Sequence, residues 1–135
     1  MSANLLENFA LLAAKKGHTV EILEKAPELG GKLNPASVPK VKFDIENYTN
    51  YLKAQIAKAP NVKVSLGVSV TNDFLKEQGY DAVVFSNGTR EGTPPIPGIC
   101  TIRYVQATDL LMDPAKLGDA KKVVVVGGGA VGLET

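Results

Sequence analysis

The spacing of apolar positions divides residues 4–25 into a helix and a strand. In residues 4–16 apolar side chains recur every three or four positions, which predicts an amphipathic helix. Its apolar face comprises Leu5, Leu6, Phe9, Leu12 and Ala13. Two lysines suit the last turn of this helix, and Gly17 can take the left-handed conformation that ends it. Residues 19–25 alternate apolar and polar side chains and predict a strand.

The middle of the chain predicts a loop, a helix and two strand regions. Three prolines and a Gly-Gly pair in residues 26–40 predict a loop without regular structure. Asp44 is a suitable N-cap for a helix over residues 44–59. Residues 61–70 predict a strand, a glycine break and a second short strand. The nearly continuous apolar run 81–86 is typical of a strand covered on both faces.

Residues 99–135 continue the alternation. They predict a short strand at 101–105, a brief helix at 107–113 and a strand at 122–127. Strands alternating with helices indicate an α/β fold, and we expect a Rossmann-like, mainly parallel sheet with helices on both faces.

Composition limits the partners and the compartment. The net charge is +1 without a basic block, which argues against nucleic acid as a partner. No apolar stretch approaches the roughly 20 residues that a spanning helix needs, so we expect no membrane association. Cys100 is the single cysteine and cannot form an internal disulfide. These features favour a reducing, cytoplasmic location.

A glycine motif follows the terminal valine run. Gly127, Gly129 and Gly132 form GxGxxG between a predicted strand and a predicted helix. In this pattern the first glycine permits a tight turn, the second lets the backbone approach a pyrophosphate, and the third lets helix and strand pack closely. The lysine and hydroxyl residue of an NTPase phosphate loop do not follow. A chance glycine-rich turn is the alternative interpretation.

Glu24 ends the first predicted strand. In a dinucleotide-binding unit an acid at this place hydrogen-bonds the adenosine ribose. The glycines that should precede the unit would fall in residues 1–6, where none occurs. A solvated carboxylate at a strand end is therefore the alternative interpretation of Glu24.

Several stretches together resemble one family. They are KKGHTVEILEKAPELGGKLNPASVP, NVKVSLGVSV, YDAVVFSNGT, PPIPGI, VQATDLL and KKVVVVGGGAVGLET. In this order they resemble the FAD/NAD(P)-binding portion of the NADH:flavin oxidoreductases related to 2,4-dienoyl-CoA reductase, from about Phe9 onward. The resemblance implies a flavoprotein oxidoreductase with FAD and NAD(P)H as cofactors.

The resemblance also implies cofactor-binding residues. Glu24 would bind the FAD ribose, with Lys25 beside it. Further implied FAD contacts are Gly30, Gly31, Lys32, Leu33, Val70, Asn87 and Gly88. The first four match the loop beside the flavin, Val70 the residue that meets the adenine, and the last two a turn close to FAD. Gly127, Gly129 and Gly132 match the start of an NAD(P)-binding domain. Lys32 and Asn87 depart from the usual residues of the family.

The resemblance divides the chain into parts. Residues 1–98 match a partial FAD-binding domain without its first strand and glycine loop, 99–120 a linker, and 121–135 the start of an NAD(P)-binding domain. We therefore expect a chain truncated at both ends, with little or no turnover of its own.

Such a chain predicts a vacant strand position in the sheet. Residues 122–127 could fill that position within one molecule, or by strand exchange in a homodimer. Residues 19–25, 81–86 and 122–127 should then lie side by side and run in the same direction. The alternative function is a non-catalytic nucleotide-binding or self-associating module.

Overall fold

The computed structural model describes residues 3–89 and 91–135. Its helices and strands are α1 (Ala3–Lys15), β1 (Val20–Glu24), α2 (Leu33–Ala36), α3 (Phe43–Lys58), β2 (Val62–Leu66), α4 (Asn72–Gln78), α5 (Ala107–Met112) and α6 (Ala130–Glu134). Short 3₁₀ helices cover Lys40–Lys42, Ile99–Thr101 and Pro114–Leu117. None of the helices in these described ranges is long and apolar enough to cross a membrane.

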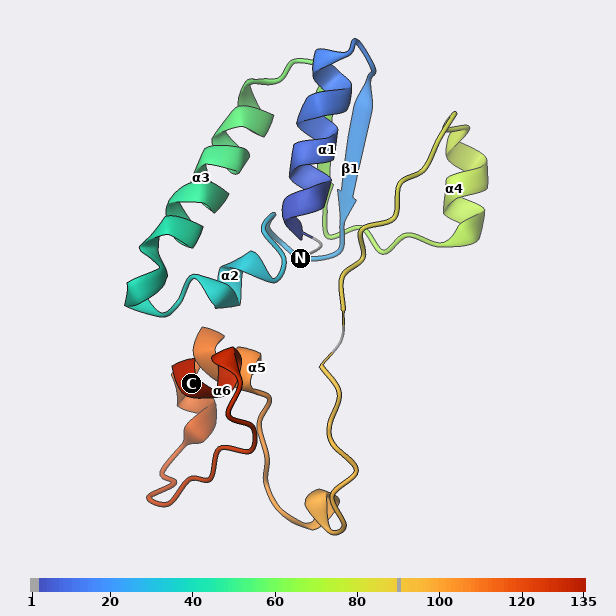
Figure 1. Ribbon diagram of the computed structural model, residues 1–135. Coiled ribbons are helices and arrows are strands. Elements are labelled where there is room, and N and C mark those ends of the chain that lie inside the picture. The colour runs from blue at the N-terminus through green and yellow to red at the C-terminus, as the bar shows by residue number, and fades with distance from the viewer. Residues whose placement is uncertain (1–2, 90) are drawn as a thin grey trace.

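β1 and β2 form a parallel pair in which Val20 lies opposite Val62 and Glu24 opposite Leu66. Parallel strands need a long crossover connection, and here α3 lies within it. α1 contacts both strands and packs against α3 (Figure 1). The chain is thus a Rossmann-like α/β protein, as the alternation of elements predicts.

The core lies where α1, β1 and α3 meet. Ala10, Ile22 and Ile56 are almost fully buried there, and Leu29 from the loop after β1 closes the cluster. The start of β2 is tied to this unit by Asn61, whose Nδ2 donates to the carbonyl oxygens of Ala14 at 2.9 Å and His18 at 2.8 Å. One side chain thereby caps the end of α1 and positions the turn into β1.

The predicted helix over 4–16 is confirmed, and its predicted apolar face is realised only in part, since Leu6 packs against the core whereas three other members are exposed. Leu5, Phe9 and Leu12 are 66%, 45% and 56% exposed, whereas Glu7 and Ala10 are 3% and 1% exposed. The helix is turned so that a small residue and an acid face the strands. Packing against β1 and α3 selects the smaller residues because it brings the backbones close together.

The long predicted loop contains a short helix. We expected no regular element in residues 26–40, but α2 spans Leu33–Ala36 with Pro35 inside it. A proline is tolerated in the first turn of a helix because amide groups there have no intrahelical partner. The expected cap at Asp44 is also wrong, since α3 begins at Phe43 and its N-cap is Lys42. Asp44 instead lies in the first turn, where its charge suits the helix dipole.

Two long apolar runs are not strands. Within residues 3–89 and 91–135 the sheet contains β1 and β2, and neither 81–86 nor 122–127 pairs with them. The side chains of Val84 and Phe85 are 50% and 71% exposed, and that of Val124 is 85% exposed. The prediction that these runs lie beside 19–25 is wrong, and so is the filling of the sheet by 122–127 within one molecule. A strand needs a neighbouring strand to bond with, and neither run pairs with β1 or β2.

The shorter predicted strands at 68–70 and 101–105 are likewise absent from the described chain, while the helix predicted at 107–113 is confirmed as α5. α4 was not predicted. The Thr71 hydroxyl accepts the Phe74 amide at 3.2 Å, and Gly79 ends α4 in the left-handed region with φ +64°. A hydroxyl cap and a terminal glycine are the sequence signals that could have revealed this helix.

Candidate functional site

The carboxyl ends of β1 and β2 meet at one edge, which is where open α/β sheets bind ligands. The Glu24 side chain lies at this edge, and its Oε1 accepts the Ala26 amide at 2.8 Å. The chain leaving β2 is fastened to the same place, because the Val68 amide donates to the Glu24 carbonyl at 3.0 Å. Lys25 is exposed beside them, and Val70 lies just beyond and is 37% exposed. Glu24 therefore lies at the carboxyl edge of the sheet, with one of its oxygens engaged by the Ala26 amide.

The loop after this edge requires glycine. Gly30 is buried with φ +112°, and Gly31 follows with φ +48°. A Cβ on Gly30 would overlap the Asn34 side chain. That side chain donates from Nδ2 to the Leu29 carbonyl at 3.2 Å, and the Leu33 amide donates to the Gly30 carbonyl at 2.9 Å. The Gly30–Gly31 loop is thus folded tightly onto the start of α2.

Glu7 reaches this loop from α1, and the sequence analysis missed it. Its Oε1 accepts the Gly30 amide at 3.2 Å. The side chain is 3% exposed, and its Oε2 has no hydrogen-bond partner among the described residues. Burial raises the pKa of Glu7, and the negative charge of Glu24 raises it further. Glu7 stands three positions before the buried Ala10, so a helical wheel centred on alanine would have placed an acid in the core.

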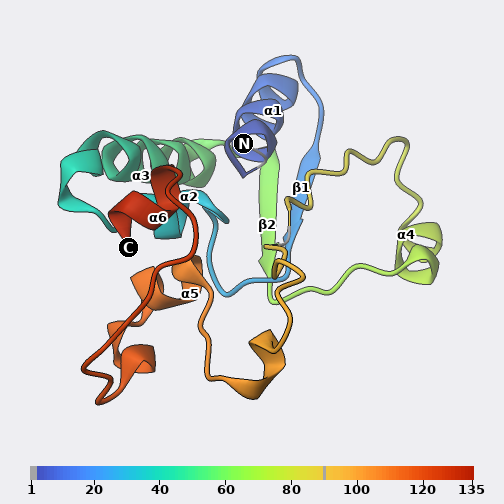
Figure 2. The same ribbon diagram turned by 60° about the horizontal axis from the view of Figure 1, so that its bottom comes forward.

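Lys32 is joined to a segment far along the chain. Its ammonium lies 3.0 Å from Glu91 Oε1, and the Thr108 hydroxyl donates to the same oxygen. The Thr108 hydrogen bond is the largest cause that lowers the pKa of Glu91. Figure 2 shows α2 and α5 as neighbours, which agrees with their contacts. Lys32, which we predicted to lie beside the flavin, therefore forms an ion pair with Glu91.

Among the other predicted FAD residues, Leu33 adjoins this loop, whereas Asn87 and Gly88 belong to a later turn. Leu33 is half-buried at the start of α2. Asn87 and Gly88 are exposed, and Gly88 has φ +72°. The turn that contains them precedes Glu91, and Glu91 is the residue that brings this segment to Lys32.

The terminal glycine motif forms a turn into α6. Gly127 has φ +116°, and Gly129 is the N-cap of α6. A Cβ on Gly132 would overlap the Gly127 carbonyl oxygen and would lie 3.6 Å from Val125 Cγ1. Glu134 Oε1 lies 2.6 Å from Lys42 Nζ, so α6 is attached near the start of α3. In Figures 1 and 2 α6 lies beside α5, which agrees with the contacts between them.

The opposite face of the strands carries a polar cluster. Glu21 accepts hydrogen bonds from Ser65 Oγ and Tyr80 Oη, each at 2.8 Å, and its Oε1 lies 2.7 Å from Lys63 Nζ. These donors, Lys63 foremost, lower the pKa of Glu21 to about 2. The contact with Glu21 raises the pKa of Tyr80. The cluster connects β1, β2 and the segment after α4.

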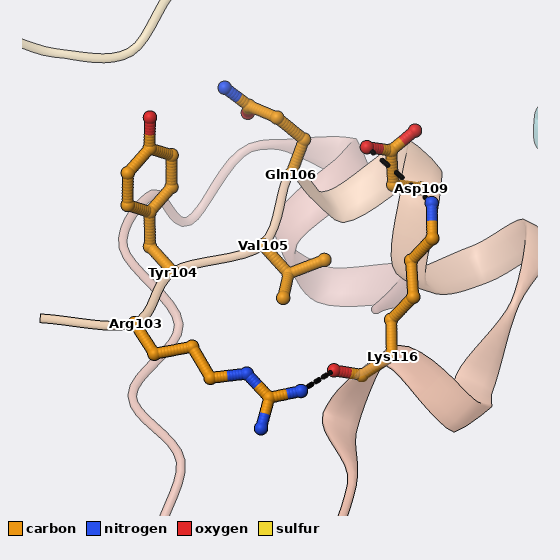
Figure 3. A pocket seen from close by; sticks show the side chains of 6 residues that line it. All are labelled: Arg103, Tyr104, Val105, Gln106, Asp109 and Lys116. Carbon is orange, nitrogen blue, oxygen red and sulfur yellow. Dashed lines mark hydrogen bonds and ion pairs between the residues drawn. The ribbon is translucent and has the colours of Figure 1, made fainter.

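A cavity of about 490 Å³ lies elsewhere, between residues 103–106, α5 and the turn after it. Figure 3 shows the Arg103 guanidinium reaching the Lys116 carbonyl, where Nη2 donates at 2.6 Å. The Lys116 ammonium lies 3.8 Å from Asp109 Oδ2. None of the predicted site residues lines this cavity. Among the described residues no three histidine, cysteine or acidic side chains are grouped so that they could hold a metal ion.

The parallel strands with an acid at the carboxyl edge and a glycine loop beyond it are the features of a nucleotide-binding α/β protein. A profile of the pyridine nucleotide-disulphide oxidoreductase family matches residues 6–135, and the chain belongs to this family. No solved structure matches the chain.

Three bacterial relatives are similar to nearly all of the chain. A cinnamate reductase of Clostridium sporogenes is 35% identical over 126 residues, which are 93% of this chain and 18% of that protein. An NADH oxidase of Thermoanaerobacter brockii is 35% identical over 93% of this chain and 20% of its own length. A metal reductase of Desulforamulus reducens is 33% identical over 94% of this chain and 19% of its own length. The chain thus spans about a fifth of the length of these relatives.

Proposed function

We propose that this chain holds FAD in an FAD-dependent oxidoreductase that takes electrons from NAD(P)H. Within its family we place it with the NADH:flavin oxidoreductases related to 2,4-dienoyl-CoA reductase. The observation that carries the proposal is the similarity over 93% of the chain to proteins named cinnamate reductase and NADH oxidase. When bound, the flavin supplies the hydride and electron chemistry, and the protein supplies position and electrostatics.

The residues that fit FAD lie on the ribose and flavin side of the expected site. Glu24 is at the carboxyl edge of β1, and the Gly30–Gly31 loop follows it with a positive φ at both glycines. We assign the ribose hydroxyls to Glu24 and the approach of the flavin to the Gly30–Gly31 loop. Lys25, Lys32, Leu33, Val70, Asn87 and Gly88 complete the proposed FAD set.

The proposal assigns NAD(P)H to Gly127, Gly129 and Gly132. It divides the chain into an FAD-binding part (1–98), a linker (99–120) and the start of an NAD(P)-binding part (121–135). It also includes a cytoplasmic location, which is supported by a single, free cysteine, Cys100. For the chain alone we expect little or no NADH oxidation, because it spans only about a fifth of the length of its relatives.

FAD titration tests the proposal. Binding would change the fluorescence of the flavin, and Glu24→Gln should weaken it about tenfold or more, because hydrogen bonds from the ribose to a charged acceptor are lost. Glu77→Gln on the exposed face of α4 is the matched control and should leave FAD binding unchanged. Failure of the wild-type chain to bind FAD, or equal binding by Glu24→Gln, would contradict the assignment. Adding NADH to flavin-loaded protein and following flavin bleaching then measures electron transfer.

A second candidate is a self-associating, non-catalytic module. Val124 and Val126 are 85% and 67% exposed in a run with the composition of a strand, which supports strand exchange of residues 122–127 in a homodimer. Light scattering during size-exclusion chromatography should then give twice the chain mass. Val124→Lys should restore the monomer, because a charge cannot be buried in the exchanged sheet. A wild-type chain that is monomeric at high concentration would exclude this candidate.

A further inference from the structure

The core of the molecule contains one acid that no part of the proposed function uses. Glu7 is 3% exposed, although carboxylates are almost never this deeply buried unless they are paired. One of its oxygens accepts a single amide, and the other has no partner among the described residues. A buried polar group in this condition calls for an explanation.

The amide that donates to Glu7 belongs to Gly30, a loop residue at which no larger side chain fits. Gly30 is buried, has a positive φ, and has no room for a Cβ. Its hydrogen bond to Glu7 ties the loop to α1, across 23 positions of sequence. The Asn34 and Leu33 hydrogen bonds hold the loop only to its own continuation. Glu7 therefore fixes the Gly30 amide to α1, while Leu29 packs the preceding residue of the loop into the core.

The charges around Glu7 do not favour its ionised form. Glu24 at the end of β1 is a like charge and raises the pKa of Glu7. Lys53 on α3 lowers that pKa, but its ammonium is 3.0 Å from Glu28 Oε2 and is shared with that carboxylate. Lys63, the charged residue of β2, contacts Glu21 on the other face of the strands. Desolvation by burial is the largest cause and outweighs the hydrogen bonds from the backbone amides of Glu7 and Gly30 and the charge of Lys53, so the pKa of Glu7 is raised.

We propose that Glu7 is a positioning residue for the Gly30–Gly31 loop, holding the Gly30 amide as a neutral carboxylic acid and releasing it on ionisation. A neutral acid keeps a carbonyl oxygen for the Gly30 amide and places no charge in the core. An ionised Glu7 gains free energy by turning toward water, and the loop then loses its anchor to α1. The contact stands on its own, whereas its relevance to FAD rests on the proposed function.

Nuclear magnetic resonance tests the contact without any cofactor. The Glu7 side-chain carbon and the Gly30 amide are followed between pH 4 and pH 8, with Glu77 in the same sample as an exposed reference. We expect both signals to share one midpoint, at a higher pH than that of Glu77. A Glu7 midpoint equal to that of Glu77, or a Gly30 amide that does not respond, would overturn the proposal.

Two variants separate positioning from simple packing. Glu7→Gln reproduces the neutral acid, because its amide oxygen can accept from Gly30 at every pH. Its Gly30 amide should not titrate, and above the wild-type midpoint should exchange with solvent about tenfold more slowly than in the wild type. Glu7→Leu keeps the apolar packing but removes the acceptor, so Gly30 should lose protection at all pH values. Equal Gly30 exchange in the wild type and Glu7→Gln at pH 8 would contradict the release step.

FAD affinity provides the last measurement and separates the two proposals. In the wild type the affinity should fall as pH rises through the Glu7 midpoint, whereas in Glu7→Gln it should not fall there. Absence of FAD binding at every pH overturns the proposed function and leaves the loop result intact. FAD binding with the same pH dependence in both proteins overturns the role of Glu7 in the cofactor site.

Discussion

The polar cluster around Glu21 makes the stability of the protein depend on pH in a defined direction. We consider the change Glu21→Gln, which removes the charge and keeps the shape. The carboxylate accepts from Ser65, Tyr80 and Lys63, and its pKa is lowered to about 2. A group whose pKa is depressed by folding contributes stability above its unfolded pKa of 4.5, and that stability is lost as pH falls toward 2.

The size of the effect follows from the three contacts. A shift from 4.5 to about 2 corresponds to an upper limit of about 3 kcal/mol. The Lys63 side chain is 71% exposed, so its ion pair contributes at most about 1 kcal/mol in water. The Ser65 and Tyr80 hydroxyls donate to a charge and account for most of the remainder. We therefore expect Glu21→Gln to lower the free energy of unfolding by about 2 kcal/mol at pH 7.

Urea denaturation at a series of pH values measures this. The stability curves of the wild type and Glu21→Gln should be separated by about 2 kcal/mol at pH 7 and should converge between pH 4.5 and pH 2. Glu77→Gln, an exposed acid on α4, is the control and should follow the wild type throughout. A separation that is the same at pH 7 and at pH 2.5 would refute the electrostatic origin of the effect.

Three further substitutions test the local geometry. Gly30→Ala should lower the free energy of unfolding by about 2 kcal/mol, because φ is +112° and the new Cβ overlaps Asn34. Gly128→Ala, whose Cβ would lie in open space, is the control and should leave the stability unchanged. Equal thermal midpoints for the two variants would contradict this reasoning. Asn61→Ala should lower the free energy of unfolding by about 1–2 kcal/mol, because the Ala14 carbonyl of α1 and the His18 carbonyl of the following turn each lose a hydrogen bond. The measurement is thermal unfolding, and an unchanged midpoint would argue against the cap. Glu91→Gln should change unfolding stability by less than about 1 kcal/mol, since its bond to Lys32 is partly exposed, and a larger loss would show a stronger bridge.

Local sequence was sufficient to predict α1 and β1. The spacing of residues 4–16 and the glycine at 17 predicted α1, which ends at Lys15 with Gly17 at φ +93°. The alternation in 19–25 predicted β1, and the acid at its end predicted a carboxylate at the sheet edge. These succeed because helix periodicity, a C-terminal glycine and strand alternation are properties of neighbouring residues.

Tertiary structure decided which candidates were realised. Residues 81–86 and 122–127 have the composition of buried strands, yet they are exposed, because an apolar run becomes a strand only when a partner supplies hydrogen bonds. The burial of Glu7 likewise depends on tertiary packing. Its spacing gives no sign that the helix turns this acid toward the Gly30 loop, since helix rotation is set by the packing of α1 on β1 and α3. The sequence by itself therefore determined the local elements and the position of Glu24, and only packing determined the sheet, the rotation of α1 and the burial of Glu7.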